Sequence, residues 1–93
     1  MVSAISSATD DSVTVGNTST TVLAADNNRR SVVLVNDSNE AIYISRSATA
    51  VMNKGIRLSA NGGAYEINAT NLYTGIITGI CASGSKNLCI SYK

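Results

Sequence analysis

The chain has 93 residues, with seven Lys or Arg against six Asp or Glu and a formal net charge of +1. This balance provides no broad basic surface for nucleic acid or for an anionic membrane. No stretch approaches the ~18 apolar residues of a membrane span. His is absent, so Ser-His-Asp and Cys-His arrangements cannot be built and the commonest metal ligand is missing. The composition favours a non-enzymatic protein, and no cofactor or metal is expected.

The first stretch, residues 1–11 (MVSAISSATDD), is small and polar and ends in two acids. Such a segment cannot bury much surface by itself. We therefore expect a flexible N-terminal arm, followed by a single domain over residues 12–93. Within that domain, weakly alternating and β-rich stretches at 12–16 and 20–25 predict the first strands.

Two arginines follow in the polar connection ADNNRR (25–30), just before the next strand. Arginine forks bind carboxylates well, so Arg29 and Arg30 are candidates for contact with an acidic partner surface. The alternative is that both are solvated ahead of the strand.

SVVLVND (31–37) is the strongest strand pattern, and AIYISRS (41–47) follows it after a short turn. A hairpin between them places two sets of side chains on opposite faces. The core face would hold Val33, Val35, Ile42 and Ile44. The other face would hold Val32, Leu34 and Tyr43. A strand that is apolar on both sides needs a second covering, which is either the chain's own N-terminal segment or another subunit.

A second hairpin is predicted over 56–69. Asn61-Gly62 is a preferred pair for a type I′ turn, since both central residues of that turn have positive φ. The resulting register puts the larger side chains on one face: Ile56, Leu58, Tyr65 and Ile67. The stretch before it, ATAVMNKG (48–55), is interpreted either as a bulged strand or as a single helical turn.

IITGICA (76–82) and NLCISYK (87–93) predict a closing hairpin, after the turn-rich connection 70–75. Ile80 and Ile90 belong to the core in this interpretation, so Cys81 and Cys89 point away from it. A three-residue loop would place the two cysteines opposite each other, where a disulfide forms only if the Cβ geometry fits. Two reduced, half-buried thiols are the favoured alternative.

Short strands separated by Gly, Asn, Asp and Ser predict an all-β fold. We expect a single-domain antiparallel β-sandwich or barrel, jelly-roll-like, with about seven to eight short strands. Tyr is the only aromatic residue, so the core consists of Val, Ile, Leu and Ala. Either this small core is sufficient, or copies of the chain stabilise one another.

Three stretches together carry a family resemblance: TTVLAADNNRRSVVLVNDSNEAIYIS, NKGIRLSANGGAYEI and NLYTGIITGICASGSKNLCISY. They resemble small all-β virion proteins of tailed bacteriophages, which decorate heads or sit on tails and fibres. The resemblance covers residues 20–92. It implies a structural, oligomeric and non-enzymatic role in the virion, after assembly in the cytoplasm of the bacterial host.

Two functions follow as expectations. The first is a capsid decoration or cement protein that forms a homo-oligomer, most simply a trimer, and binds the major capsid protein or other virion proteins. Its candidate interface residues are Arg29, Arg30, Val32, Leu34, Tyr43 and Tyr73. The alternative is a carbohydrate- or receptor-binding module of a tail or fibre. Tyr73 would then be the stacking platform, because Tyr65 and Tyr92 are assigned to the core.

Overall fold

Eight short strands form the described part of the protein, as the alternating segments predict. The computed structural model describes residues 7–93 and contains no helix in that range. The strands are β1 (Thr9–Val15), β2 (Thr20–Leu23), β3 (Val32–Asn36), β4 (Ile42–Ser45), β5 (Ile56–Leu58), β6 (Ala64–Ile67), β7 (Ile77–Cys81) and β8 (Lys86–Tyr92). The all-β prediction is confirmed.

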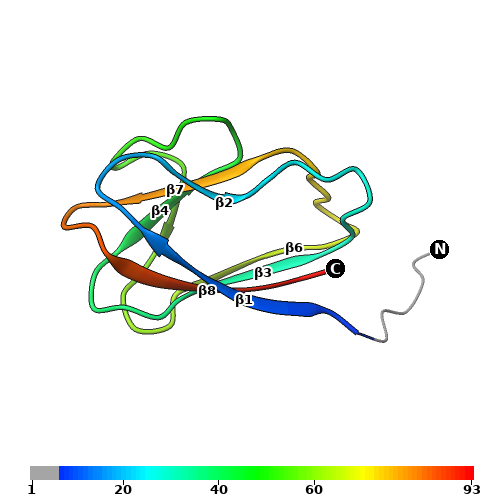
Figure 1. Cartoon of the computed structure of the whole chain (residues 1–93), viewed down its shortest axis with the longest axis horizontal. Coiled ribbons are helices and arrows are strands. Elements are labelled where there is room, and N and C mark those ends of the chain that lie inside the picture. Colours follow the sequence, from blue (N-terminus) through cyan, green and yellow to red (C-terminus); the bar gives the residue numbers. More distant parts are fainter. Residues whose placement is uncertain (1–6) are drawn as a thin grey trace.

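The strands build two antiparallel four-stranded sheets that face each other (Figure 1). Sheet A has the order β1-β8-β3-β6, and sheet B has the order β2-β7-β4-β5. Every connection crosses from one sheet to the other, except the one between β4 and β5. This order is that of a jelly roll, a double-sheet sandwich of eight strands. The two sheets do not close into a barrel, so the sandwich alternative is the correct one.

The three predicted hairpins are wrong, because in each of them the two strands lie in different sheets. Asn61 and Gly62 have the expected positive φ values of 60° and 113°. The chain nevertheless crosses between the sheets there, and β5 pairs with β4 while β6 pairs with β3. Alternation predicts which side of a strand faces the core, but it does not predict the neighbouring strand. The apolar side chains of two strands can share one core either in a hairpin or in two facing sheets.

The buried face of β3 is the opposite of the predicted one. Val32 and Leu34 face the interior, whereas Val33 is 37% exposed on the outer side. Asn36 is also buried, and its amide donates to the carbonyl oxygens of Glu40 (2.7 Å) and Leu58 (2.9 Å). Since Leu58 belongs to sheet B, this side chain joins the two sheets. Val32 and Leu34 are therefore corrected from interface candidates to core residues.

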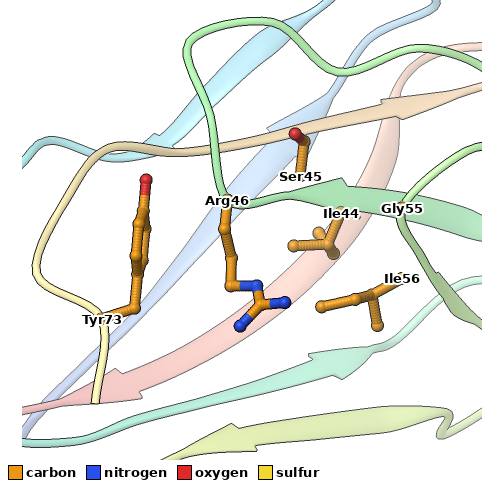
Figure 2. Close-up of a pocket in the computed structure, with 6 residues that line it drawn as sticks. All are labelled: Ile44, Ser45, Arg46, Gly55, Ile56 and Tyr73. Atoms are coloured by element: carbon orange, nitrogen blue, oxygen red, sulfur yellow. The ribbon is translucent and has the colours of Figure 1, made fainter. Parts of the chain in front are cut away.

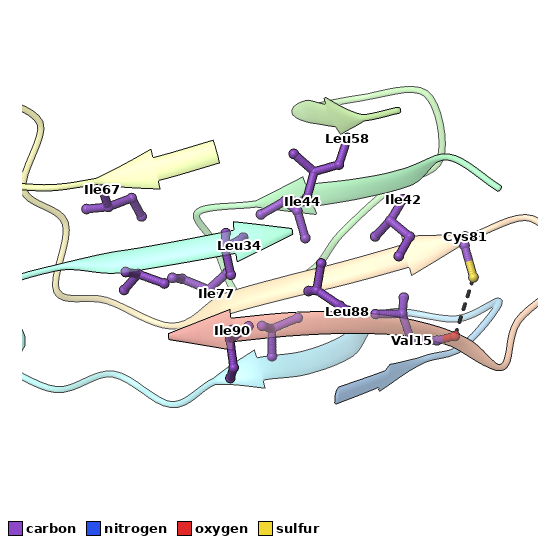
Figure 3. Packing of buried hydrophobic residues seen from close by; sticks show 12 residues of the cluster. Val15, Leu34, Ile42, Ile44, Leu58, Ile67, Ile77, Cys81, Leu88 and Ile90 are labelled. Atoms are coloured by element: carbon purple, nitrogen blue, oxygen red, sulfur yellow. Dashed lines mark hydrogen bonds between the residues drawn. The ribbon is translucent and has the colours of Figure 1, made fainter. Parts of the chain in front are cut away.

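The core lies between the sheets and is almost entirely aliphatic (Figure 3). Five predicted core residues are confirmed in it: Ile42, Ile44, Leu58, Ile67 and Ile90. Ile56 packs against them from the rim, and Val35 lies with Val33 on the outer side of sheet A. Ile80 is buried, but on the outer side of sheet B beside Tyr43.

The two cysteines are free and lie in different sheets, so the predicted opposition of Cys81 and Cys89 is wrong. Cys81 points into the core and donates its Sγ–H to the Val15 carbonyl oxygen at 3.3 Å (Figure 3). Cys89 points outward from sheet A, as predicted. β7 is an inner strand buried on both faces, so its alternation does not distinguish the core side.

The connection between β4 and β5 covers part of the outer side of sheet B. Thr78 Oγ1 donates to the Ser47 carbonyl oxygen at 3.0 Å, and the Ala50 amide donates to Ser19 Oγ at 2.8 Å. Residues 48–55 form turns, neither a strand nor a helix. Val32 and Leu34, whose covering the sequence left open, are covered by sheet B of the same chain across the core.

β1 begins at Thr9, inside the segment expected to be a flexible arm. It pairs with β8 along its whole length, from Thr9 opposite Tyr92 to Val15 opposite Lys86. Residues 9–11 therefore belong to the domain. The rest of the expected arm falls mostly on residues 1–6, which lie outside the described residues.

Candidate functional site

The candidate site is a cavity of about 460 Å³ at one end of the sandwich (Figure 2). Its lining comes from the end of β4, the start of β5 and the connection between β6 and β7. The lining residues are Ile44, Ser45, Arg46, Gly55, Ile56 and Tyr73. We call it the Arg46–Tyr73 pocket.

Strand alternation brings Arg46 into this pocket. Ile42 and Ile44 point inward from β4, and Arg46 continues the same side just past the end of the strand. The Arg46 side chain is exposed, and Figure 2 shows its guanidinium between Tyr73 and the two isoleucines of the lining. A cation thus lies beside an apolar wall.

Gly55 allows β5 to approach β4 closely at this point. Its φ is +85°, and a Cβ atom there would lie 2.5 Å from the Ile44 carbonyl oxygen. Any other residue would strain the backbone and push the strands apart. The glycine therefore places Ile56 next to Ile44 in the apolar wall.

The Tyr73 ring is fixed in place. Its hydroxyl donates to the Ile76 carbonyl oxygen at 2.7 Å. Behind it lies Gly75, where a Cβ atom would come within 2.7 Å of Tyr73 Cζ. The ring lies directly against the backbone of Gly75, and a side chain at that position would displace it.

Arg29 holds the segment that carries Tyr73. It is only 3% exposed, and its guanidinium donates to the carbonyl oxygens of Tyr73 (3.2 Å), Gly75 (3.2 Å) and Ala24 (2.6 Å). The interpretation of Arg29 as a solvated residue is wrong, because the side chain is buried. Its guanidinium donates to carbonyl oxygens of its own chain, where the sequence analysis had considered an acidic partner surface. An Asx turn, in which the Asn28 amide donates to Asp26 Oδ1 at 2.9 Å, directs the chain so that Arg29 points inward.

Side-chain hydrogen bonds also hold the beginning of the same connection. The Asn68 amide donates to Asn71 Oδ1 at 2.7 Å, and Asn71 Nδ2 donates to the Glu66 carbonyl oxygen at 3.0 Å. The 68–76 connection is therefore fixed near both ends, although it contains no regular secondary structure.

The structure brings together only two of the predicted site residues, Arg29 and Tyr73. Arg30 is exposed, and Tyr43 is half-buried on the outer side of sheet B between Ile80 and Arg57. The sequence interpretation missed Arg46. Its position two residues after Ile44 was the available signal, because alternation places it on the inward side.

A second polar cluster lies around Glu40, between β3 and β4. Its carboxylate accepts hydrogen bonds from the Ser83 amide (2.8 Å) and the Ser83 hydroxyl (2.7 Å). These bonds, with a smaller contribution from the Lys86 charge, hold the pKa of Glu40 below its ordinary value of 4.5. The cluster ties the β3–β4 connection to the loop before β8.

The lowered pKa of Glu40 predicts a pH dependence of stability. Stabilisation by the ionised carboxylate is complete above pH 4.5 and is lost as the pH falls through the lower folded-state pKa, because the unfolded chain binds the proton more readily. In urea unfolding, wild type should lose more stability than Glu40→Gln between about pH 5 and pH 3. Ser83→Ala, which keeps only the amide donor, should fall between them. Parallel curves for wild type and Glu40→Gln would contradict this assignment.

Within residues 7–93, no group of three or more His, Cys, Asp or Glu side chains is placed to hold a metal ion. No helix of this described part is long and apolar enough to cross a membrane. Comparison with protein-family models, with curated proteins and with solved structures finds no match to the chain.

Proposed function

We propose that the chain is a non-enzymatic structural protein of a tailed-phage particle, a capsid decoration protein that assembles with copies of itself and with the major capsid protein. The sequence resemblance supports this role. The jelly-roll strand order is also compatible with it, since viral capsid domains use this architecture, as do lectins and cupins. The observation that carries the proposal is the opposite charge of the two outer faces.

The outer face of sheet A combines an apolar centre with carboxylates. Two rows of neighbouring residues cross the sheet there: Asp10, Ser91, Val33 and Glu66 in one, and Ser12, Cys89, Val35 and Ala64 in the other. Asp37 lies at the end of β3, where it accepts a hydrogen bond from Asn87 Nδ2 at 3.2 Å. An apolar centre with a polar rim is the usual anatomy of a protein interface.

The outer face of sheet B has the opposite charge. Residues 41–65, which include β4 and β5, contain no Asp or Glu. Their cations are Arg57 on the outer face, Lys54 in the connection between β4 and β5, and Arg46, which points to the pocket instead. All three cations are exposed, and Arg57 pairs with the half-buried Tyr43. This face can therefore receive both the carboxylates and the apolar row of sheet A.

Opposite charges on opposite faces favour contact between sheet A of one copy and sheet B of the next. Pairing sheet A with itself would place carboxylates against carboxylates. Head-to-tail contacts close into a ring when the rotation between copies allows it. Val33 and Tyr43 would lie on the two sides of each contact. Because the two faces are back to back, a closed trimer forms only if each contact rotates the next copy strongly, and contacts without that rotation give an open row.

Light scattering after size-exclusion chromatography tests this assembly. Wild type should have a mass that is a multiple of the 9.6 kDa monomer, and Val33→Glu should be monomeric. Arg57→Glu should weaken assembly, and adding Glu66→Lys to the same chain should restore it. Arg30→Glu is the control, because it reverses an exposed charge that lies on no strand of either sheet. A monomeric wild type at about 100 µM, well above the Kd of a stable assembly, would overturn the ring.

Particles of the phage that encodes the chain test its place in the virion. Mass spectrometry of gradient-purified particles should find the chain at a fixed ratio to the major capsid protein. Particles carrying Val33→Glu should contain much less of it. Absence of the chain from wild-type particles would overturn the structural role.

A second candidate function is carbohydrate or receptor binding on a tail or fibre. The Arg46–Tyr73 pocket favours it, because a fixed aromatic ring lines an open cavity there. Such a module should bind soluble glycans in the absence of any particle.

A further inference from the structure

We propose that the Arg46–Tyr73 pocket binds a sugar residue that carries a carboxylate. Arg46 would pair with the carboxylate, and the Tyr73 ring would support the apolar face of the sugar. This inference rests on the second candidate function and names the class of its ligand.

The charge of the pocket favours an anion. Arg46 is its only charged lining residue, so no neighbouring carboxylate of the lining competes for the guanidinium. A guanidinium can grip a carboxylate with two parallel hydrogen bonds. The isoleucine wall beside it excludes water from one side, which strengthens such a bond relative to one in open solvent.

The shape of the pocket favours a ring-shaped ligand with a flat apolar side. Its volume of about 460 Å³ lies within the ~300–1,000 Å³ range of small-molecule sites. Tyr73 is already immobilised by Gly75 and by its bond to Ile76, so little side-chain entropy is lost on binding. Ser45 also belongs to the lining, but its hydroxyl points to the other side of β4 and shares a hydrogen bond with Ser47 Oγ (Figure 2), so Arg46 and Tyr73 are the polar side chains offered to the ligand.

Arg29 acts as the positioning residue of this site. A buried cation is costly unless its donors are satisfied, and here they are directed to the backbone of Tyr73 and Gly75. These bonds hold the segment in place without any ligand. Preorganisation of this kind is what a binding surface requires and what a simple connection between strands does not.

Titration of ¹⁵N-labelled protein followed by NMR tests the inference. The ligands are methyl β-glucuronide and methyl α-sialoside, with methyl β-glucoside as the neutral match and acetate as the bare anion. Both acidic sugars should produce saturable shifts around residues 44–46, 55–56 and 73. The glucoside and acetate should each bind at least ~10-fold more weakly, as expected when one charge-assisted contact is lost.

Matched variants locate the contacts. Arg46→Ala should abolish the preference for acidic sugars, and Arg46→Lys should retain only part of it because the fork is lost. Arg30→Ala removes one exposed positive charge outside the pocket and should leave binding unchanged. Tyr73→Phe should keep most of the affinity for acidic sugars. Tyr73→Leu should lose this affinity, while its NMR spectrum away from the pocket stays that of the folded wild type.

Each result decides a different claim. Equal binding of glucuronide and glucoside would overturn recognition of the carboxylate but leave glycan binding intact. Equal binding of acetate and the acidic sugars would show a site for small anions and would overturn recognition of the sugar ring. No saturable shift with either acidic sugar would overturn the inference. The second candidate function would be overturned with it only if the neutral glucoside also produced no saturable shift. Oligomer mass and particle content test the decoration role separately.

Discussion

Arg29→Ala is expected to lower the free energy of unfolding by about 2–4 kcal/mol, although the residue lies in a connection between strands. The substitution leaves the carbonyl oxygens of Ala24, Tyr73 and Gly75 without the donors they now have. It also removes the cost of burying a cation, so the net loss is smaller than the sum of three charged hydrogen bonds. Urea unfolding of the monomeric domain measures the effect.

Arg30→Ala is the matched control for this prediction. Arg30 is exposed, so its replacement should change the stability by less than ~0.5 kcal/mol. Arg29→Lys should recover only part of the loss, because an ammonium group cannot reach three carbonyl oxygens in the fork geometry of arginine. Similar effects of Arg29→Ala and Arg30→Ala would mean that Arg29 is solvated after all.

Leu34→Ala is expected to destabilise the domain by about 2.5–5 kcal/mol, whereas Val33→Ala should cost less than ~1 kcal/mol. Leu34 is fully buried between the sheets, and its neighbour Val33 is 37% exposed on the outer face. Unfolding should be measured at low protein concentration, so that assembly does not contribute. A larger loss of stability in Val33→Ala than in Leu34→Ala would show that Val33 faces the core, with β3 in the opposite orientation.

The fold class could be predicted because strands with one buried face alternate apolar and polar residues in the sequence. Ile42 and Ile44 alternate with Tyr43 and Ser45, and the structure buries the first pair and leaves the second half-buried. Strand pairing could not be predicted in the same way. Positive φ at Asn61 and Gly62 fits a tight hairpin turn, and it fits equally well the crossing between two sheets that the chain makes there.

The orientation of β3 shows a second limit. Val32 to Val35 is apolar at every position, so alternation gives no direction. Asn36 then suggests the wrong face, because a polar residue normally marks the solvent side. Its side-chain amide is satisfied by the carbonyl oxygens of Glu40, four residues later, and of Leu58, which is distant in the sequence and lies in sheet B.

The candidate site could be predicted only in part. Tyr73 was singled out because the other tyrosines had places in the core or on a strand face. The role of Arg29 depends on contacts with Tyr73 and Gly75, far along the chain, and no local pattern contains them. The inward position of Arg46 is predictable, since it follows Ile44 by two residues and alternation places both on the same side.

Chemical cross-linking tests most directly the claim that sheet A of one copy contacts sheet B of the next. Thr21 is exposed and points outward from sheet B, Cys89 points outward from sheet A, and Cys81 is buried. A bismaleimide spanning about 10 Å, the spacing of packed sheets, should link Thr21→Cys chains into dimers and closed multiples. Wild type should remain uncross-linked. Cross-linked wild-type dimers, joined through Cys89 of both copies, would show that sheet A pairs with itself and would contradict the head-to-tail assembly.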